Sequence, residues 1–358
     1  MRFSSSARYA VSVLASAAFL AACNGGGGSQ STGYAPSGAA PAAHHVDVHS
    51  GFPANTSFRP LKNVHPDHAK SRVSSDIAKL PRLLFVSDDD TDDVYIFTMP
   101  TMQLKGTLTG FAEPQGMCTD RSGNIWITNT ETSQVLQYSR AGVAMGSVSV
   151  PGYFPVGCAI NKTNGDLAVT NIVSTAGGDG NVEVFPGATG TGNILTNPSQ
   201  TEYFFPTYDK SGNLYVDGFG TSGYILSQCP SGSSSCSTMT VSGVSPGFPG
   251  GLNWDRVNNG IILGDQECAT GSCQYAATIS GSTATVTGTT PVNGISGGIC
   301  DVDQGTIAPM SKYFAGGCIS EATGQSSAAA RWAYPAGGTP GNSNTTAEYP
   351  IGAAISNK

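Results

Sequence analysis

Short apolar runs that alternate with tight polar turns fill the chain from Leu83 onward. The clearest unit, residues 111–139, reads FAEPQGMCTDRSGNIWITNTETSQVLQYS. Its runs MCTD and NIWITNT flank the polar turn DRSGN, and VLQYS follows after another polar gap. This pattern predicts strand, hairpin, strand, loop and strand. No helical periodicity competes with it.

Degenerate repeats of this unit follow along the chain. FPVGCAINKTNGDLAVTNIV with NVEVFPG, FFPTYDKSGNLYVDGFG with GYILSQC, and FPGGLNWDRVNNGIILGDQ with QYAATIS share an opening Phe-Pro and a polar turn. A weaker copy begins ISGGICDVDQGTIAP and resumes at RWAYPAGG. The repeat length is about 40 to 50 residues, which is typical of a four-stranded propeller blade. It is read from Pro114, Pro155, Pro206, Pro249 and Ser296.

The two ends of the repeat region predict how the ring closes. YPIGAAISNK, at residues 349–358, matches FPVGCAINK, at residues 154–162, but has no second strand after it. The first segment, LLFVSDDDTDDVYIFTMPTMQLKGTLTG, starts at a second strand and lacks a first one. We therefore predict an all-β, six-bladed β-propeller in which the C-terminal strand completes the first blade and no sheet edge stays open.

The N-terminal residues predict export and a lipid anchor. Arg2 and Arg8 precede AVSVLASAAFLAA, an apolar run that is too short to span a membrane and has the form of a secretory signal. The run ends in LAAC at residues 20–23, which resembles the lipobox of bacterial lipoproteins. That resemblance implies that Cys23 is lipidated. The alternative is an ordinary signal peptide with a chance cysteine, but the following NGGGGSQSTG suits a lipid tether.

Four segments follow from these patterns: a signal peptide at residues 1–22, a Gly/Ser/Ala/Pro tether at 23–43, an irregular lead-in at 44–80, and the propeller at 81–358. The expected location is the bacterial cell envelope, outside the cytoplasm, with the membrane as a partner through Cys23. In a Gram-negative host, Asn24 would suit the outer membrane. We expect a monomer.

Charge excludes one class of partner. Without residues 1–22, the chain loses Arg2 and Arg8 and keeps 15 of its 17 basic residues against 24 acidic ones. This excess of acidic residues argues against nucleic acid as a partner. The abundance of Gly (47 residues) and Pro (21 residues) suits many strands and turns.

Nine cysteines include Cys23, which leaves eight in an oxidising compartment. Cys229 and Cys236 flank PSGSSS, and Cys268 and Cys273 flank ATGS, so both pairs are predicted to be disulfides that close loops. Three others are assigned to equivalent first strands, where we favour small buried residues over a metal site. Cys300 is the expected partner of Cys318. The three first-strand residues are Cys118, Cys158 and Cys300.

Two segments could bind metal ions but have plainer explanations. The lead-in carries every histidine, a composition that can bind transition metals, although we favour solvated side chains. Residues 87–93, SDDDTDD, offer five carboxylates to a calcium ion, which takes six to eight oxygens, but such runs are usually solvated. The histidines are His44, His45, His49, His65 and His68.

The repeat resembles the NHL-repeat and gluconolactonase-like group of six-bladed propellers, over about residues 83–358. This resemblance implies a divalent cation, usually calcium, held at the top of the central channel by Glu, Asn and Asp side chains, with an Asp as acid or base. The group's Glu-Gly-Pro motif is absent, and EPQG at residues 113–116 is a loose echo. Residues that end equivalent second strands could be the ligands, although an Asn or Asp there also suits a tight loop, which we favour. They are Asp88, Asn129, Asn171 and Asp265, with Glu113 as a further candidate.

The same resemblance predicts that the second-to-third-strand connections share one face with the links into the first strands. IVSTAGGDG, QECATGSC and SKYFAGGCISEATGQSSAAA would be the elaborated connections, while Asp120, Asp209, Asp255 and Asp301 would form short turns on the opposite face. Aromatic residues beside proline in the links could stack on a sugar or peptide, although core packing is the commoner role. They are Phe111, Phe154, Phe205, Phe248 and Tyr349.

Function is the least determined property. The streptogramin-lyase type of propeller is also similar, but it needs histidines within the blades, and none follows His68. A Ser-His-Asp triad would need His65 or His68 to fold over the channel. We favour a non-enzymatic binding or scaffolding module that presents its loop-rich face to a protein, peptide or glycan. The alternative is a calcium-dependent lactonase-like hydrolase, with calcium as its cofactor.

Overall fold

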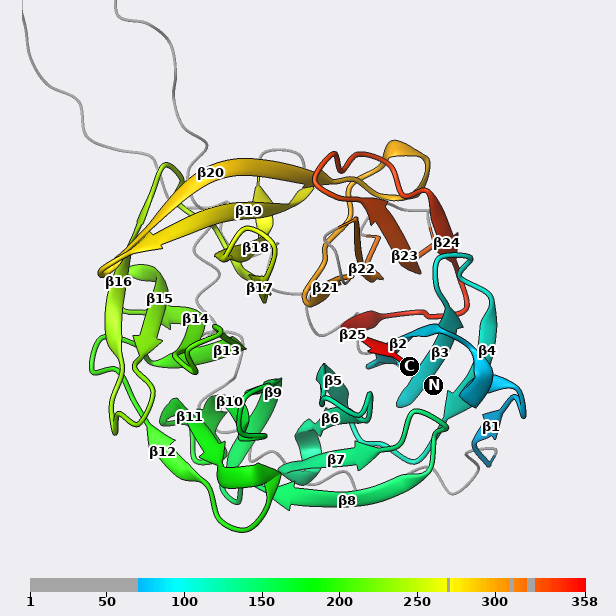
Figure 1. Cartoon of the computed structure of the whole chain (residues 1–358), viewed down its shortest axis with the longest axis horizontal. Coiled ribbons are helices and arrows are strands. Elements are labelled where there is room, and N and C mark those ends of the chain that lie inside the picture. The colour runs from blue at the N-terminus through cyan, green and yellow to red at the C-terminus, as the bar shows by residue number, and fades with distance from the viewer. Residues whose placement is uncertain (1–69, 269–270, 309–311, 321–325) are drawn as a thin grey trace, which may run out of the picture. The chain divides into compact units, whose positions relative to one another are not determined.

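The computed structural model describes residues 70–268, 271–308, 312–320 and 326–358, which form a ring of β-sheets (Figure 1). The predicted signal peptide, the tether, Cys23 and all five histidines lie outside these ranges. Within them, no helix is long and apolar enough to cross a membrane.

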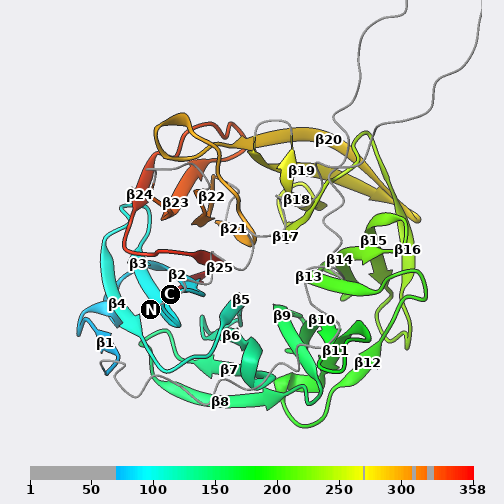
Figure 2. The same cartoon turned by 180° about the vertical axis from the view of Figure 1, so that it is seen from behind.

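Blade 2 shows the repeating unit. Its strands β5 (Pro114–Thr119), β6 (Ile125–Asn129), β7 (Gln134–Tyr138) and β8 (Ala144–Ser149) pair antiparallel in that order. β5 lies nearest the ring axis and β8 at the rim (Figures 1 and 2). The prediction of strand, hairpin, strand, loop and strand is confirmed for β5, β6 and β7.

The other blades repeat this order. Blade 3 contains β9 (Tyr153–Ile160), β10 (Leu167–Ser174), β11 (Asp179–Phe185) and β12 (Asn193–Leu195). Blade 4 contains β13 (Glu202–Tyr208), β14 (Leu214–Gly220), β15 (Gly223–Cys229) and β16 (Ser237–Ser242). Blade 5 contains β17 (Pro249–Asp255), β18 (Gly260–Cys268), β19 (Gly271–Ser280) and β20 (Thr283–Val292). Blade 6 contains β21 (Gly305–Ile307), β22 (Tyr313–Cys318), β23 (Ala328–Ala333) and β24 (Asn342–Asn344).

Blade 1 is assembled from both ends of the described chain. β25 (Pro350–Asn357) pairs antiparallel with β2 (Arg82–Asp88), and β3 (Asp93–Thr98) and β4 (Leu104–Leu108) continue the sheet. The predicted closure by the C-terminal strand is therefore confirmed. A short additional strand, β1 (Arg72–Val73), comes from the predicted lead-in and pairs with β4.

The propeller class is confirmed, but hydrogen bonding divides the strands into five sheets instead of six. Blades 4 and 5 share one eight-stranded sheet, because their outer strands β16 and β20 pair in parallel at Thr240–Ser242 and Thr283–Thr285. The apolar packing still has six parts, since a separate buried cluster fills each of the six junctions between neighbouring blades.

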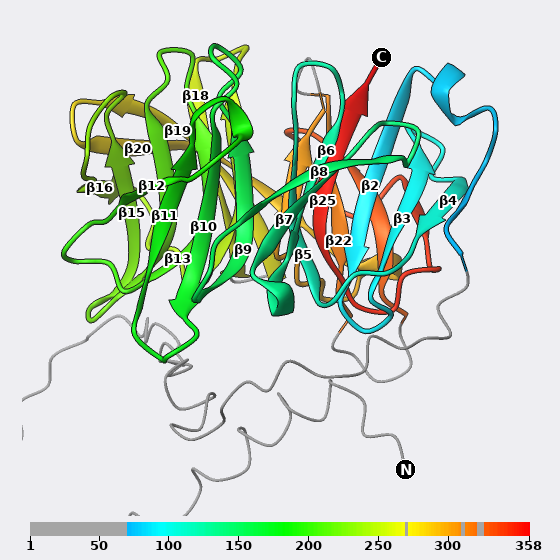
Figure 3. The same ribbon diagram turned by 90° about the horizontal axis from the view of Figure 1, so that it is seen from below.

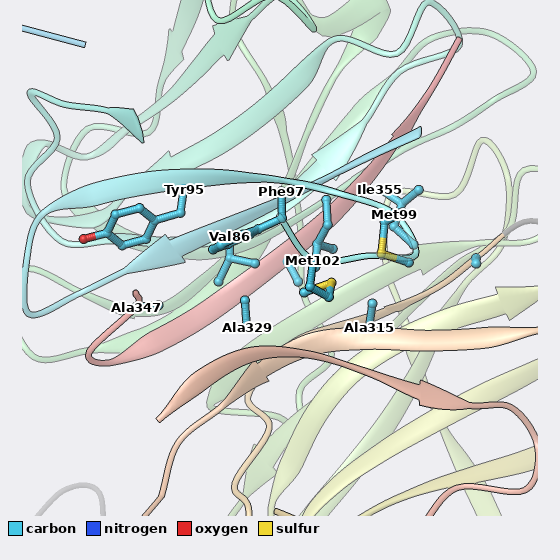
Figure 4. Packing of buried hydrophobic residues seen from close by; sticks show 12 residues of the cluster. Val86, Tyr95, Phe97, Met99, Met102, Ala315, Ala329, Ala347 and Ile355 are labelled. Carbon is cyan, nitrogen blue, oxygen red and sulfur yellow. The ribbon is translucent and has the colours of Figure 1, made fainter. Parts of the chain in front are cut away.

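The junction that closes the ring lies between blades 1 and 6. Figure 4 shows Val86, Phe97 and Ile355 of blade 1 facing Ala315 and Ala329 of blade 6. Large side chains on one blade thus meet alanines on the other, which fills the junction without separating the sheets.

Glycines allow the inner strands to come close to one another. A Cβ on Gly116 would lie 2.3 Å from the Val156 carbonyl oxygen, and one on Gly157 would lie 2.4 Å from the carbonyl oxygen of Phe204. Both glycines follow a Pro by two residues, so the Pro-x-Gly part of the repeat marks where one inner strand touches the next.

Blade 6 differs from the prediction. ISGGIC precedes the first strand, β21, which begins only at Gly305, and the segment assigned to a loop, YFAGGC, is the second strand, β22. Asp301 accordingly lies in the link, bridged to Ile319, and not in a short turn. The sequence misleads here because Ala-Gly-Gly-Cys has little apolar character, yet its small residues suit a strand pressed against β25.

All eight cysteines in the described ranges are paired. The two predicted loop disulfides are present, and Cys300 pairs with Cys318 as expected. The sequence favours small buried residues over a metal site at Cys118 and Cys158 and leaves their pairing open. The two residues form a disulfide between the inner strands β5 and β9, whose Cα atoms are 5.6 Å apart at this point. The two loop disulfides are Cys229–Cys236 and Cys268–Cys273.

We predict that Gly157→Ala lowers the free energy of unfolding by about 1 to 3 kcal/mol, the usual cost of overpacking. The new methyl group would meet the Phe204 carbonyl and the Thr170 hydroxyl, 2.7 Å away. Urea and thermal denaturation measure the effect. Gly146→Ala on β8 is the control, because its nearest atom would be 4.0 Å away. Equal loss of stability in the two variants would contradict this account of the inner strands.

Candidate functional site

The propeller has two distinct ends. We call the end that carries the links into the first strands and the second-to-third-strand connections the loop face. The end that carries the first-to-second-strand turns is the turn face. In the side view of Figure 3, the C-terminus emerges at the turn face and the connection from β2 to β3 lies at the loop face. The candidate site residues lie at the loop face.

One repeat position lies at or near the loop-face end of the second strand in every blade. Asp88 shows its role: Oδ2 accepts hydrogen bonds from the amides of Glu348 (2.5 Å) and Tyr349 (3.2 Å). Its Oδ1 accepts the amides of Asp90 and Thr91, both at 3.1 Å. The carboxylate thus fastens the link into β25 to the connection after β2. The residues at this position are Asp88, Asn129, Asn171, Asp217, Asp265 and Cys318.

Asn129 and Asp265 act in the same way. Asn129 Oδ1 accepts the amide of Ala112 at 2.8 Å. Asp265 Oδ1 accepts the amides of Gly247 and Phe248, both at 3.1 Å, and its Oδ2 accepts the hydroxyl of Tyr275 at 3.2 Å. These side chains satisfy backbone donors that the folded links would otherwise leave unpaired.

Hydrogen bonds within the protein already use oxygens of three of the four predicted metal ligands. Calcium needs six to eight oxygens, whereas the oxygens of Asp88, Asn129 and Asp265 are already hydrogen-bonded within their own blades. Only Asn171 keeps a buried Oδ1 with no hydrogen-bond partner. Among the described residues, no group of three or more His, Cys, Asp or Glu side chains is placed to hold a metal ion.

In blades 4 and 6, the same position holds residues that the sequence did not predict as metal ligands. Asp217 Oδ1 accepts the amide of Phe205 at 2.8 Å. In blade 6, Cys318 is joined by a disulfide to Cys300 in the link before β21, so a covalent bond replaces the hydrogen bonds. Asp217 could have been found from the repeat, because LYVD aligns with ILGD, which ends at Asp265.

Asp217 is also the most perturbed carboxyl group at this position. It is fully buried, and its Oδ2 has no hydrogen-bond partner. Burial raises the pKa of Asp217 well above its usual range, because the charged form would lose its hydration. Asp217 therefore holds the Phe205 amide of β13 from a fully buried position that disfavours its charged form.

Carboxylates gather where blades 1, 2 and 6 meet. Burial raises the pKa of Asp89 to about 7, helped by the charges of Asp92, Asp90, Asp88 and Glu131. Burial likewise raises the pKa of Asp303 to about 7, with contributions from Asp301 and Asp89. Both residues remain partly accessible to solvent. They make this part of the loop face a region whose charge changes near neutral pH.

Glu113, the further ligand candidate, lies beside this region. Its backbone is in the left-handed conformation, with φ of 51°, and its amide donates a 2.8 Å hydrogen bond to Asp92 Oδ1. A non-glycine residue rarely adopts this conformation. The link into β5 is therefore shaped by the acidic connection of the neighbouring blade.

The predicted aromatic face needs correction. Phe111, Phe154 and Phe205 are 1%, 7% and 4% exposed, so they pack inside the propeller and cannot stack on a ligand. Their links place them where neighbouring blades meet, and burial of a large ring there is favourable. Phe248 and Tyr349 remain partly exposed.

Phe248 belongs to an aromatic cluster that the sequence did not reveal. Its ring centroid lies 5.5 Å from that of Phe204 and 5.2 Å from that of Phe219, both in edge-to-face arrangements. Phe204 and Phe219 also contact each other edge to face, at 5.8 Å. Blades 4 and 5 thus contribute a partly exposed aromatic cluster at the loop face.

We predict that the stability of the propeller falls as pH rises from about 4 towards the raised pKa of Asp217, by at most about 1.4 kcal/mol per pH unit from this residue. Within that window, the native state keeps a proton that the unfolded chain has released. Asp217→Asn keeps an acceptor for the Phe205 amide and should remove this contribution to the slope. Asp217→Ala loses the acceptor and should destabilise at every pH. Urea denaturation from pH 4 to pH 8 tests both, and an unchanged slope in the Asn variant would contradict the assignment.

We expect millimolar calcium, or a chelator, to leave the melting temperature unchanged, because the oxygens at the candidate ligand position are occupied. A bound ion at about 100 times its dissociation constant would stabilise the protein by about 2.7 kcal/mol and raise the melting temperature by several degrees. Scanning fluorimetry with calcium, magnesium and a chelator provides the measurement. A calcium-specific rise that Asn171→Ala abolishes would restore the metal site.

Comparison with known proteins supports the fold, and one family profile matches part of the chain. A sequence profile of the SMP-30/Gluconolactonase/LRE-like region matches residues 82–173, from β2 to the end of β10. No curated protein sequence matches the chain.

Solved structures resemble the propeller at low identity. A protein of unknown function from Bacteroides caccae aligns with a TM-score of 0.58 and 12% identity over 78% of this chain and all of that one. A chain of a nidogen/laminin complex aligns with a TM-score of 0.56 and 11% identity, over 77% of this chain and 98% of that one. TolB from Acinetobacter baumannii aligns with a TM-score of 0.56 and 12% identity, over 80% of this chain and 68% of that one. At these identities the likeness concerns the fold alone.

Proposed function

We propose that this protein is an extracytoplasmic binding module whose loop face engages a cationic, partly apolar segment of another protein or peptide. The observation that carries the proposal is the composition of that face. Its described links and second-to-third-strand connections contain no Lys or Arg. They contain several carboxylates and Phe248, whose partly exposed ring packs against the partly exposed Phe219 of β14 and the buried Phe204 of β13.

The chemistry of the face suits such a partner. Carboxylates attract and orient cationic side chains, and the edges and faces of the aromatic rings can receive apolar groups or a guanidinium. Asp89 Oδ1 is a buried acceptor with no hydrogen-bond partner within the protein. A donor from a partner would satisfy that acceptor.

The proposed location is the bacterial cell envelope, with the propeller tethered through a lipid on Cys23. The LAAC sequence at residues 20–23 and the Gly-rich segment after it support this tether. The four disulfides support an oxidising compartment, because such bonds are rare in the cytosol.

A calcium-dependent lactonase-like hydrolase is the second candidate. The profile match over residues 82–173 favours it. The hydrogen bonds of Asp88, Asn129 and Asp265 oppose it, since backbone amides would compete with a metal ion for these oxygens. The calcium experiment above separates the two candidates.

We predict that a labelled peptide of alternating Lys and Trp binds the loop face, and that Asp89→Asn with Asp303→Asn weakens binding by about three- to tenfold. That range corresponds to about 1 kcal/mol, the expected value of two partly exposed ion pairs. Binding should also weaken from pH 8 to pH 6, because both carboxyl groups have pKa values of about 7 and become neutral. Fluorescence anisotropy at fixed ionic strength gives the affinities.

The matched control is Asp166→Asn with Asp209→Asn, which removes the same charge from the turn face. This pair should bind the peptide like the unmodified protein. If it weakens binding as much as the loop-face pair, or if affinity does not depend on pH, the peptide is attracted only by net charge and the loop face is not the site.

A further inference from the structure

The turn face carries one cation at each first-to-second-strand turn of blades 2 to 6 and one at the corresponding place in blade 1. In blades 2 to 6 the cation lies within the turn or at its end, and in blade 1 it directly follows β25, beside the start of β2. Most of these side chains are exposed, and Lys162 is half-buried. The six cations are Arg121, Lys162, Lys210, Arg256, Lys312 and Lys358.

Acidic neighbours do not neutralise this charge through ion pairs. Among the described residues, one salt bridge is present, and it joins Lys105 to Asp76 at 3.4 Å. The turn aspartates accept hydrogen bonds from their own turns. Asp120 Oδ1 accepts the amides of Ser122 and Asn124 at 2.8 and 2.9 Å. The equivalent carboxylates of Asp209 and Asp255 accept amides of their turns in the same way.

The cations also act on one another across the face. Lys162 Nζ donates a hydrogen bond to the carbonyl oxygen of Thr119 in the neighbouring blade. Burial lowers the pKa of Lys162 to about 8, and the charges of Arg256 and Arg121 lower it further, whereas Asp120 opposes them. Since these residues come from blades 2, 3 and 5, the charges of the turn face act on one another across blades.

Exposed apolar side chains accompany the cations. Val257, next to Arg256, is 65% exposed, and Val143, in the turn from β7 to β8, is 62% exposed. Leu104 and Met145, 40% and 54% exposed, lie where the outer strands β4 and β8 leave the turn face. Single exposed apolar residues are common, but these four lie at one end of the propeller among its cations.

We propose that the turn face docks on the anionic headgroup region of a phospholipid membrane. Basic residues near such a surface are attracted by its negative potential, and apolar side chains between them can enter the boundary between headgroups and acyl chains. A soluble polyanion would use the cations but leave Val143 and Val257 without a role, so the apolar residues favour the membrane. The proposal does not rest on the peptide-binding role of the loop face.

Vesicle co-sedimentation tests the proposal. The chain from residue 24 onward is used, so that neither an attached lipid nor the apolar segment of residues 1–22 contributes. It should sediment with phosphatidylcholine vesicles that contain about one third phosphatidylglycerol, and not with phosphatidylcholine alone, with affinity that falls as salt rises. Arg121→Gln with Arg256→Gln should weaken binding by about 30-fold, since each cation contributes about fivefold. No sedimentation with anionic vesicles at low salt would overturn the proposal.

Two further pairs make the result specific. Lys70→Gln with Arg72→Gln removes the same charge from outside the turn face and should leave vesicle binding unchanged. An equal loss in this pair would overturn the proposal. Val143→Ser with Val257→Ser should weaken vesicle binding but not binding to heparin, a soluble polyanion. If that pair leaves vesicle binding unchanged, the turn face recognises dissolved polyanions and not a membrane surface.

Discussion

The close approach of the inner strands around the axis is the constraint on which the rest of this structure depends. At Gly116, Gly157 and Gly352, a single added carbon would lie between 2.1 and 2.4 Å from the backbone of the neighbouring inner strand. That spacing lets the side chains of the second and third strands meet in six buried clusters, one at each blade junction. It also explains why the ring needs β25, since without this inner strand β2 would present an open edge.

Near the ends of the second strands, residues that suggest a metal site instead serve to hold the fold together. Each link into a first strand turns sharply and exposes amides that water cannot easily reach, so an Asp or Asn beside it is needed as an acceptor. Asp88 fills this role through Oδ2 and Asp265 through Oδ1, while the second oxygen of each accepts other hydrogen bonds within its blade. Cys318 fills it with a disulfide, which shows that the position serves to hold the link. The buried oxygens left over on Asn171 and Asp217 are departures from that rule.

The two ends of the propeller carry opposite charge for different local reasons. On the turn face, tight turns direct aspartates inward to their own amides and leave a neighbouring Lys or Arg in solvent. On the loop face, burial, with a contribution from neighbouring carboxylates such as those of residues 88–93, raises the pKa values of Asp89 and Asp303 to about 7. The molecule can therefore present two surfaces of different chemistry, one suited to a cationic segment and the other to an anionic surface.

The sequence by itself determined the all-β propeller, the blade period, the closure by the last strand and the two loop disulfides, because each is written in local alternation, turn residues or short spacing. The strands of blade 6 were not predicted correctly, because the small residues of β22 form a strand only through contact with β25. Only the tertiary structure decided that Phe111 and Phe205 are core residues, that Cys118 pairs with Cys158, and that Asp88 and Asp265 hold backbone amides. These outcomes depend on which residues of neighbouring blades come into contact. No local pattern in a single sequence reveals those long-range contacts.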